Sequence, residues 1–382
     1  MLLRFARLCV VRPGNMRPLT FHILRELSVE RFTSGAALAS QFDVSRSAIS
    51  DALKEASDNG VEIFKLTRRG YKLAAPLDLL NLDLIRQLLD SQAGRVNIEV
   101  LDSVDSTNSE LTRRIAHVQL PLLLPSGTCV VTEIQTAGRG RRGRMWQSGL
   151  GTSLTFSLLW RFEKGAAQLG GLSLVVGLAI VKALRAQGLV EAQVKWPNDI
   201  LVGSQQHQKL GGILIETQGD MLGPTAAVIG IGINVNLPSA MKRAIDQPVT
   251  DFVSHSTMPI TRNALLVAIL QALLPALGKF NTLGFAAFRH EWLGLHAYQD
   301  CVVTVSQAGG EPFSAMVSGV ANDGSLLVKP QIGNTINSAI NIKEIALSSA
   351  EISIRSALVR EQNDHLDPRE SNKTTTPSPV KS

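Results

Sequence analysis

The chain has 382 residues and a net charge of +6, with 45% apolar and 5% aromatic residues. This length predicts two or three domains with a sizeable buried core, and the scarcity of aromatic residues argues against an extensive stacking surface for single-stranded nucleic acid. The three cysteines are far apart and form no CxxC pair, which argues against a disulfide scaffold or a cysteine zinc site and fits a reducing cytoplasm.

The positive charge is concentrated in two short segments. Four arginines lie in residues 1–17 without an acidic residue, and four more lie in residues 139–144. Together they exceed the net charge of +6, so the rest of the chain is slightly acidic. This pattern argues against a uniformly basic coat for nucleic acid, and the second segment predicts a loop that binds an anionic ligand.

Residues 1–16 form an arginine-rich leader that we expect to be disordered. Its composition is typical of an organelle transit peptide, but it also fits an upstream start codon with Met16 as the working start. We favour the second interpretation because a DNA-binding pattern follows directly. The longest apolar run, residues 170–181, is shorter than the ~18–20 residues of a membrane span, so we expect no membrane association.

Residues 17–75 predict a winged helix-turn-helix domain. Helices are expected at 19–27, 35–42 and 46–57, because Ser34 and Ser45 can cap the second and third, and strands 61–66 and 71–73 form the wing. The third helix and the wing tip carry side chains able to reach phosphates or base edges, namely Arg46, Ser47, Ser50, Lys54, Arg68 and Arg69. A helical packing module without a DNA role is the alternative.

Residues 76–95 predict a linker with a short helix at 82–89, and residues 96–297 predict a larger domain. Its strands are expected at 97–101, 128–135, 153–160, 193–195, 200–202, 210–216 and 227–235, and its helices at 108–116, 166–186, 263–281 and 286–292. The hairpin 200–216, followed at once by the next strand, indicates an antiparallel run. The expected class is α+β, a mostly antiparallel sheet with helices on one face.

Residues 298–352 predict a small β-barrel. Short strands are expected at 301–305, 313–320, 326–329 and 337–340, and the sequence Asn322-Asp323-Gly324 is a strong hairpin turn. Residues 353–382 are polar, with serine, threonine, proline and mixed charge, and little apolar content after Val359. We expect them to be a disordered tail.

The segment GRGRRG at residues 138–143 follows a predicted strand. It matches GxGxxG literally, but a dinucleotide fingerprint needs a helix directly after the glycines, and here the strand 153–160 follows. The arginines Arg139, Arg141 and Arg144 can form bidentate bonds to phosphate or carboxylate oxygens. We therefore expect a flexible cationic loop that folds over a polyanion; a solvated surface loop is the alternative.

Other segments also combine polar side chains with close backbone approach. Thr107 and Glu110 form a capping box at a helix start that can also bind a small polar ligand. The turn 195–199 places an amide beside a carboxylate, which suits Mg²⁺ or phosphate, although an ordinary Asx turn looks the same. The glycines of 209–214 and 230–236 let a ligand approach the backbone. The sequence contains no GxxxxGK[ST], HExxH or GxSxG motif.

Together these segments resemble the biotin protein ligases, in the bifunctional bacterial form that also represses the biotin operon. The resemblance spans about residues 17–350 and rests on motifs in the family's order at 105–108, 138–146, 195–199, 209–214 and 230–234. The chain departs from the family pattern at Thr136, at Ser148-Gly149 and at Gly211, and none of these departures touches a charged group.

The resemblance implies that biotin is activated by MgATP as biotinoyl-5′-AMP and transferred to a lysine, with no tightly bound prosthetic group. By resemblance, the catalytic residues are Lys209, Arg141 and Asp199. Biotin and biotinoyl-AMP would contact Ser106, Thr107, Asn108, Gln135, Arg139, Gly140, Arg141 and Lys209. ATP would contact Arg144, Asn198, Asp199 and Asn234, and Asp199 would also hold Mg²⁺.

The same resemblance implies an SH3-like C-terminal barrel and a cytoplasmic protein with three kinds of partner. These are the biotin carboxyl carrier protein of acetyl-CoA carboxylase, operator DNA, and a second copy of the chain in a homodimer promoted by biotinoyl-AMP. Two alternatives stay open at this point: a lipoate-type ligase, which is related in fold, and a ligand-sensing repressor without catalysis.

Overall fold

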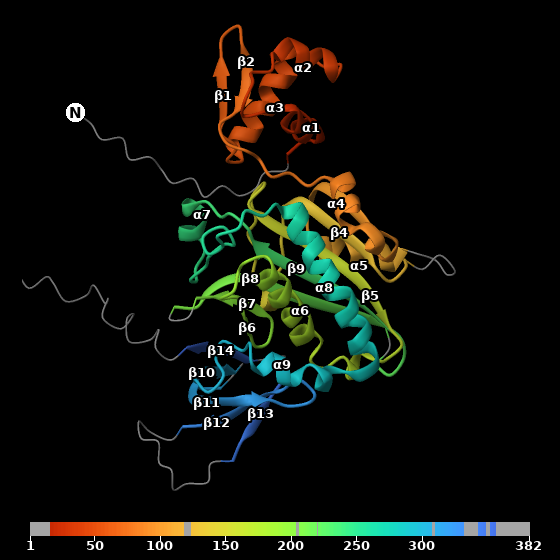
Figure 1. The fold of residues 1–382 in the computed structure, drawn as a ribbon, viewed down its shortest axis with the longest axis vertical. Helices are drawn as coiled ribbons and strands as arrows, with labels where there is room; N and C mark the ends of the chain where they lie inside the picture. The colour runs from red at the N-terminus through yellow and green to blue at the C-terminus, as the bar shows by residue number, and fades with distance from the viewer. Residues whose placement is uncertain are drawn as a thin grey trace, which may run out of the picture. The chain divides into compact units, whose positions relative to one another are not determined.

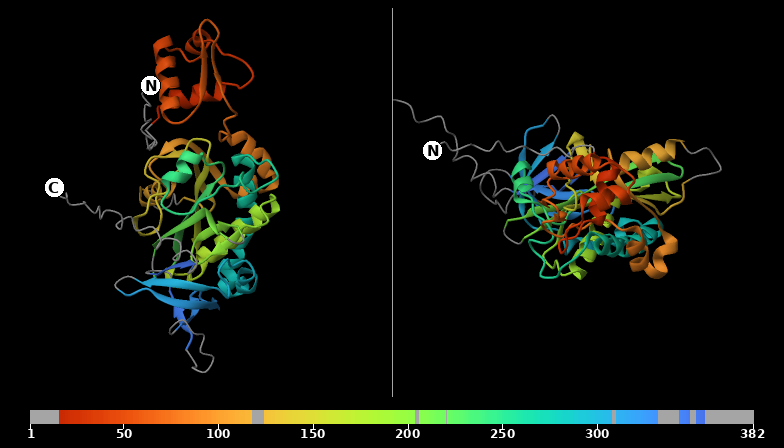
Figure 2. Two further views of the ribbon diagram at one scale, coloured as in Figure 1. Left: turned by 90° about the vertical axis from the view of Figure 1, so that its left-hand side faces the viewer. Right: turned by 90° about the horizontal axis from the view of Figure 1, so that it is seen from above.

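The computed structural model describes residues 16–117, 124–203, 206–219, 221–307, 310–331, 343–348 and 352–356. The chain divides into two compact units (Figure 1). The first extends to Ala297 and includes the turn Asn322–Gly324, and the second holds the rest of the C-terminal part. Figure 2 shows the same elements from two further directions.

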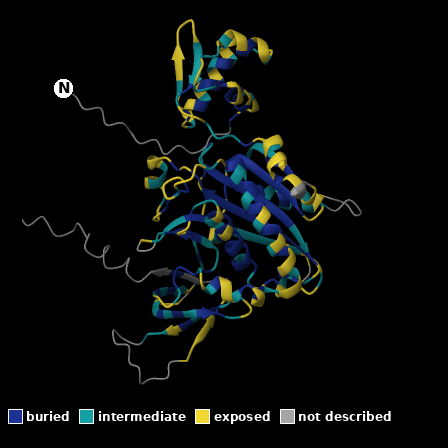
Figure 3. Cartoon of the chain, in the orientation of Figure 1, coloured by how far each residue is buried: buried dark blue, intermediate teal, exposed yellow. Residues whose placement is uncertain are grey.

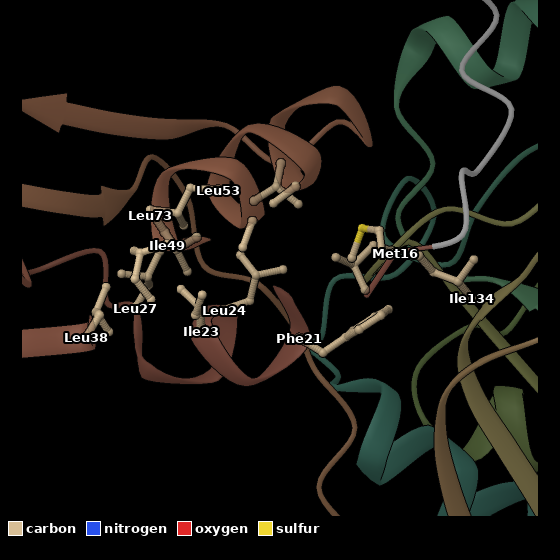
Figure 4. Close-up of a cluster of buried hydrophobic side chains, with 14 of the residues drawn as sticks. Met16, Phe21, Ile23, Leu24, Leu27, Leu38, Ile49, Leu53, Leu73 and Ile134 are labelled. Atoms are coloured by element: carbon tan, nitrogen blue, oxygen red, sulfur yellow. The ribbon is translucent and has the colours of Figure 1, made fainter. Parts of the chain in front are cut away.

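The N-terminal part of the first unit is the expected winged helix-turn-helix. Helices α1 (Pro18–Glu26), α2 (Gly35–Gln41) and α3 (Arg46–Asp58) precede the hairpin of β1 (Ile63–Leu66) and β2 (Gly70–Leu73). The hydroxyls of Ser34 and Ser45 accept hydrogen bonds from backbone N–H groups and cap α2 and α3, as the sequence predicts. Figure 4 shows the apolar side chains that bury the inner faces of these helices.

The central sheet has the strand order β3-β4-β5-β9-β8-β7-β6. Its strands are β3 (Asn97–Val104), β4 (Thr128–Gln135), β5 (Ser153–Phe162), β6 (Gln193–Lys195), β7 (Asp199–Val202), β8 (Gln208–Gly219) and β9 (Thr225–Asn234). β3 and β4 run parallel, and the other pairs in the described part of this sheet are antiparallel. The strands at its centre are buried almost throughout (Figure 3). The α+β class is confirmed.

Strand register divides the helices between the two faces of the sheet. Ile213 pairs with Ile231 and Ile231 with Phe156, so these side chains share one face, against which α6 (Leu172–Ala186) and α8 (Arg262–Leu283) pack. Leu214, Gly230 and Ser157 share the opposite face by the same pairing. Helix α5 (Thr107–His117) lies on that opposite face, because the side chain of Asn108 contacts all three. The expectation that helices cover a single face therefore fails at α5.

Several element boundaries also differ from the sequence prediction. The helix expected at 166–186 is a 3₁₀ turn, Ala166–Gln168, followed by α6, because Gly171 adopts a left-handed conformation (φ 78°) between them. The helix expected at 286–292 is likewise a 3₁₀ turn, Phe285–Ala287, followed by α9 (Arg289–Leu293). Helix α7 (Ser239–Ala244) was not predicted, and α4 (Leu82–Leu89) and α8 lie where expected.

Helix α8 is long and apolar enough to cross a membrane by length and composition. About 56% of its most apolar window is buried within the protein, and core helices of globular domains pass the same test. Its buried residues include Leu266, Leu270 and Leu277, and Phe280 packs edge-on against Phe162 of β5. The apolar sequence of α8 is thus explained by its place on the sheet.

The second unit contains an antiparallel sheet of order β13-β12-β11-β10-β14. Its strands are β10 (Val302–Gln307), β11 (Phe313–Val320), β12 (Leu326–Pro330), β13 (Ile345–Leu347) and β14 (Ile352–Ser356). The strand expected at 337–340 lies outside the described residues. Strand β14 shows that the expected disorder from residue 353 is wrong for 353–356, because Ile354 is buried opposite Val305 of β10 despite the polar composition around it.

Candidate active site

On the face of the central sheet that carries α5, three glycines, Gly212, Gly230 and Gly232, leave the strand backbone uncovered by side chains of their own. We call this surface the glycine floor. Gly212 on β8 pairs with Gly232 on β9, and Gly230 follows two residues away on the same face. A Cβ on Gly232 would lie 2.6 Å from the ring of Trp146, and one on Gly230 would overlap the amide of Asn108. Only glycine lets these two side chains lie directly on the strand backbone. This floor is the close approach that the glycine pattern predicts.

A buried network of neutral polar groups lies at one end of the floor, where α5 begins. Gln135 Oε1 accepts hydrogen bonds from Thr107 N at 2.9 Å and Thr107 Oγ1 at 3.3 Å. Ser157 Oγ lies 2.7 Å from Thr107 Oγ1 and 2.6 Å from Asn108 Oδ1. Ser106 is buried beside them. The structure therefore brings together the residues predicted from the 105–108 motif and Gln135, and it adds Ser157.

The arginine–glycine segment, expected as a flexible cationic loop, forms a small hairpin. Trp146 N donates to Gly138 O at 2.9 Å, and Gly140 N donates to Arg144 O at 2.8 Å. A 3₁₀ turn, Arg141–Gly143, closes its tip. Because the tip is a 3₁₀ turn in which Arg142 adopts a left-handed conformation (φ 57°), the arginines do not all face the same way.

The arginines of this hairpin go to different places. Arg139 forms an ion pair with Glu216, with Nη2 2.6 Å from Oε1, whereas Arg141 Nη1 donates to Asn198 Oδ1 at 3.0 Å. Burial lowers the pKa of the Arg141 guanidinium from its ordinary value, and the nearby charge of Arg142 acts in the same direction. Arg142 and Arg144 are exposed at the tip. Of the predicted arginines, Arg141 faces the charged end of the floor.

Lys209 and Asp199 form that charged end. Lys209 Nζ lies 2.7 Å from Asp199 Oδ1, and Lys195 Nζ lies 4.0 Å from Asp199 Oδ2. The lysine side chain lies over Gly212, where a Cβ would come within 3.5 Å of its Nζ. This cluster of two lysines, one carboxylate and the Arg141 guanidinium has an excess of positive charge. It can neutralise an anion that rests on the glycine floor.

A rigid turn holds the two predicted residues Asn198 and Asp199. The Trp196–Pro197 peptide is cis. Asn198 Nδ2 donates to Ile213 O at 2.8 Å, and Ile213 N donates to Asn198 O at 2.9 Å. Asn198 is therefore fixed to β8 by one side-chain and one backbone hydrogen bond, and its Oδ1 accepts from Arg141.

Asn234 lies at the end of β9 with a structural partner. Its side-chain Nδ2 donates to Thr250 O at 3.0 Å, and its backbone carbonyl oxygen accepts from Phe252 N at 3.0 Å. Lys209 N and O also bond to Pro248 and Thr250. Asn234 thus anchors a segment around Thr250 beside Lys209, rather than directing its amide to open space.

A magnesium site held by the protein alone does not fit these residues. Both oxygens of Asp199 face lysines, and the amide oxygen of Asn198 is occupied by Arg141. Within the described residues, no group of three or more His, Cys, Asp or Glu side chains could hold a metal ion. A hard divalent cation prefers several oxygen ligands and is commonly carried by substrate phosphates.

The predicted DNA-contacting side chains lie on the surface of the winged helix-turn-helix. Arg46, Ser47 and Lys54 on α3 are exposed, Ser50 is half-buried, and Arg68 and Arg69 are exposed at the turn between β1 and β2. Arg68 adopts a left-handed conformation (φ 67°), which shapes the tip of the wing. All of these positions except Ser50 are thus exposed, and their contact with DNA stays a prediction.

Besides Ser157, two residues at or beside the site were not predicted from the sequence. Glu216 lies on the floor face because it is four residues from Gly212 along β8, an alternation that could have identified it. His296 is buried and lies with Nε2 3.4 Å from Trp196 N, where it can accept a hydrogen bond beside the cis turn. Its distance of 100 residues along the chain left no local signal.

Comparison with known proteins identifies the family of this chain. Residues 100–235 match the biotin/lipoate A/B protein ligase family, and residues 20–72 match an HTH domain. The chain is 34% identical over 340 residues to the bifunctional ligase/repressor BirA of Salmonella typhimurium, covering 87% of this chain and 98% of that protein. It is 35% identical over 329 residues to the Escherichia coli K12 protein of the same name, covering 84% and 94%.

Among solved structures, the biotin protein ligase from Aquifex aeolicus in complex with biotin and ATP is similar. Its TM-score is 0.54 at 27% identity, and the match covers 68% of this chain and 99% of that one. That structure holds both biotin and ATP.

Proposed function

This chain belongs to the family of bifunctional biotin ligase/repressors, and we propose that its glycine-floored sheet face is where ATP activates biotin. The observation that carries this proposal is the pairing of two unlike ends on one floor. A neutral hydrogen-bonding network lies at α5, and the Lys209–Asp199–Arg141 cluster lies across Gly212 and Gly232.

The neutral end suits the ureido head of biotin. A ureido group offers two N–H donors and one carbonyl acceptor, and it carries no charge. Thr107, Asn108, Gln135 and Ser157 provide donors and acceptors in a buried site, where each unsatisfied polar group costs about 1–3 kcal/mol. Such a site distinguishes a ureido head from the apolar dithiolane of a lipoyl group.

The charged end suits the reaction of two anions. An oxygen of the biotin carboxylate forms a bond to the α-phosphorus of ATP, and the bond from that phosphorus to the bridging oxygen breaks, releasing pyrophosphate. Lys209 can neutralise the extra charge of the transition state, where a donor of this kind contributes roughly 3–4 kcal/mol. Arg141 of the hairpin adds a second positive charge beside it. Mg²⁺ would enter with ATP on its phosphate oxygens.

The second half-reaction needs a protein lysine as the acceptor. Its amine nitrogen attacks the acyl carbon of biotinoyl-5′-AMP, the bond to the AMP oxygen breaks, and the nitrogen loses a proton. A mixed anhydride hydrolyses readily, so the hairpin 138–146 would exclude water until the acceptor arrives. The carboxyl carrier protein of acetyl-CoA carboxylase is the expected acceptor, in the cytoplasm.

The helix-turn-helix gives the chain its repressor role. One such module makes few contacts, so two modules joined in a dimer would bind a palindromic operator far more tightly. We expect a mainly monomeric protein without ligand, a dimer with biotinoyl-AMP, and salt-sensitive operator binding only in the second state. Sedimentation with and without a non-hydrolysable adenylate, followed by a mobility-shift assay, tests this; equal oligomeric states would contradict it.

The alternatives are less well supported. A repressor without catalysis would not require Lys209 and Arg141 to converge on the floor, and the curated relatives described above are named as ligases as well as repressors. A lipoate-type ligase is disfavoured by the polar network and by the helix-turn-helix domain.

Incubation with biotin, ATP labelled at the α-phosphate and an apo carrier domain tests the activity. We expect labelled AMP and biotinylated carrier, both dependent on biotin, and no lipoylated carrier when lipoate replaces biotin. Failure to release pyrophosphate in the presence of biotin and ATP would contradict the assignment of this face as the active site.

A further inference from the structure

Glu216 lies where β8, the start of α5 and the hairpin 138–146 meet, and it has no role in the reaction described above. It lies on β8, on the floor face, between the start of α5 and the base of the hairpin 138–146. Its carboxylate is not paired with the cationic cluster around Lys209. Glu216 therefore places a negative charge beside the neutral end of the site.

The two oxygens of Glu216 serve different partners. Oε1 accepts from Arg139 Nη2 at 2.6 Å, while Oε2 accepts from Asn108 Nδ2 at 2.9 Å and lies 3.3 Å from Arg139 Nη1. Arg139 Nη1 also donates to Ser109 Oγ on α5 at 3.2 Å. One carboxylate thus joins the hairpin to the first turn of α5.

The hydrogen bond from Asn108 Nδ2 to Glu216 helps to fix the orientation of the Asn108 amide. Asn108 Oδ1 accepts from Ser157, and Asn108 Nδ2 donates to Glu216 and to Leu214 O. Leu214 O and the Glu216 carboxylate both accept from Nδ2, so without the carboxylate the orientation of the amide is held less strongly. Glu216 therefore orients a group in the neutral end of the floor without lying at its centre.

The bond to Arg139 reaches the hairpin at its base. Arg139 pairs with Met145 across the hairpin, and Gly138 O accepts from Trp146 N, so the ring of Trp146 follows the position of Arg139. That ring covers Gly232. The ion pair of Arg139 with Glu216 therefore also helps to keep the Trp146 ring in place over Gly232.

The exposure of the pair fits a contact that opens and closes. The Arg139 and Glu216 side chains are 47% and 30% exposed. A pair of this exposure adds little net stability to the fold, because water screens the charges and the side chains lose freedom when they pair. It can therefore break and re-form as ligand enters and leaves.

We propose that Glu216 is a positioning residue that latches the hairpin 138–146 through Arg139 while it orients Asn108, so that closure and order at the neutral end occur together. This inference rests on the proposed function and deepens it. It assigns Arg139 to the latch, and it leaves the neutralisation of phosphate to Lys209 and Arg141.

The test measures how fast preformed biotinoyl-AMP leaves the full-length protein. We expect Glu216→Gln and Arg139→Gln each to increase the dissociation rate by about tenfold, the effect of one charge-assisted hydrogen bond. The double variant should be no worse than either single variant, because both remove the same contact. The charge exchange Glu216→Arg with Arg139→Glu should recover part of the retention.

Glu99→Gln is the matched control. Glu99 forms an ion pair of the same length, 2.6 Å, with Arg114 on α5, away from the hairpin. It should leave adenylate retention unchanged. The rate of pyrophosphate release at saturating substrate, measured on the same variants, should fall by a smaller factor than the dissociation rate rises, which separates lost retention from lost chemistry or folding.

The outcomes are distinguishable from failure of the proposed function. If wild-type protein forms no biotinoyl-AMP, the ligase assignment fails. If it forms and retains the adenylate but Glu216→Gln and Arg139→Gln retain it equally well, the latch is wrong. Strictly additive effects in the double variant would also overturn the latch, because the two residues would then act separately.

Discussion

The two ends of the glycine floor differ in charge and in burial. At α5, the side chains of Thr107, Gln135 and Ser157 are neutral, buried and mutually hydrogen-bonded. At the opposite end, Lys209 and Asp199 are charged and about one-fifth exposed. Burial suits the first end because neutral groups cost little to bury once they are paired, whereas charges must keep partners and water. Specificity is thus separated from charge neutralisation along one sheet face.

The largest expected effect is at the charged end. Lys209→Ala should lower the rate of pyrophosphate release at saturating substrate by at least about 100-fold, because a charge-assisted donor to the reacting phosphate is lost. Lys182→Ala, which removes an exposed lysine paired with Glu291, is the control and should be near wild type. A rate within threefold of wild type for Lys209→Ala would remove this lysine from the reaction.

The next effect concerns the hairpin where it meets the charged end. Arg141→Gly removes the bond to Asn198 and should loosen retention of biotinoyl-AMP, by roughly tenfold or more, more than it slows its formation. Released adenylate would then biotinylate unrelated lysines, which mass spectrometry of a bystander protein would detect. Undiminished retention, with no stray biotinylation, would show that Arg141 does not hold the cover.

A smaller effect is expected at the neutral end. Ser157→Ala removes the hydroxyl that joins Thr107 to Asn108 and should raise the KM for biotin about tenfold, as expected for about 1.5 kcal/mol. The KM for ATP should stay within twofold. Equal changes in both constants would mean that the two ends are not separate.

The last effect concerns stability rather than rate. Burial lowers the pKa of His296 from 6.5 to about 3, helped by the charges of Lys195 and His207. Between these values the unfolded chain binds a proton that the folded protein excludes. Wild type should therefore lose stability as the pH falls below about 6.5, by up to about 1.4 kcal/mol per pH unit.

Denaturant titrations of wild type and His296→Gln between pH 7 and 4.5 measure this contribution. The variant keeps an acceptor for Trp196 N but cannot be protonated, so its stability should depend less steeply on pH. Above pH 7 the difference between the two proteins should be constant. Parallel curves over the whole range would show that His296 is not the group responsible.

Much of this molecule follows from local sequence. Ser34 and Ser45 cap their helices as their positions predict, and the motifs at 195–199, 209–214 and 230–234 meet at one face because β7, β8 and β9 are neighbours. Prediction failed where a distant contact outweighed local preference. Ile354 continues a strand in a polar segment because β10 supplies a partner and a buried position.

The sequence by itself determined the domain order, the capped starts of α2 and α3, the glycines of the floor and the concentration of arginines at residues 139–144. Only the tertiary structure decided that Arg139 faces Glu216 while Arg141 faces Asn198, and that α5 lies opposite α6. The physical reason is that capping and alternation depend on neighbours along the chain. The partner that each arginine reaches depends on contacts between residues 57 or 77 positions apart, which no local preference encodes.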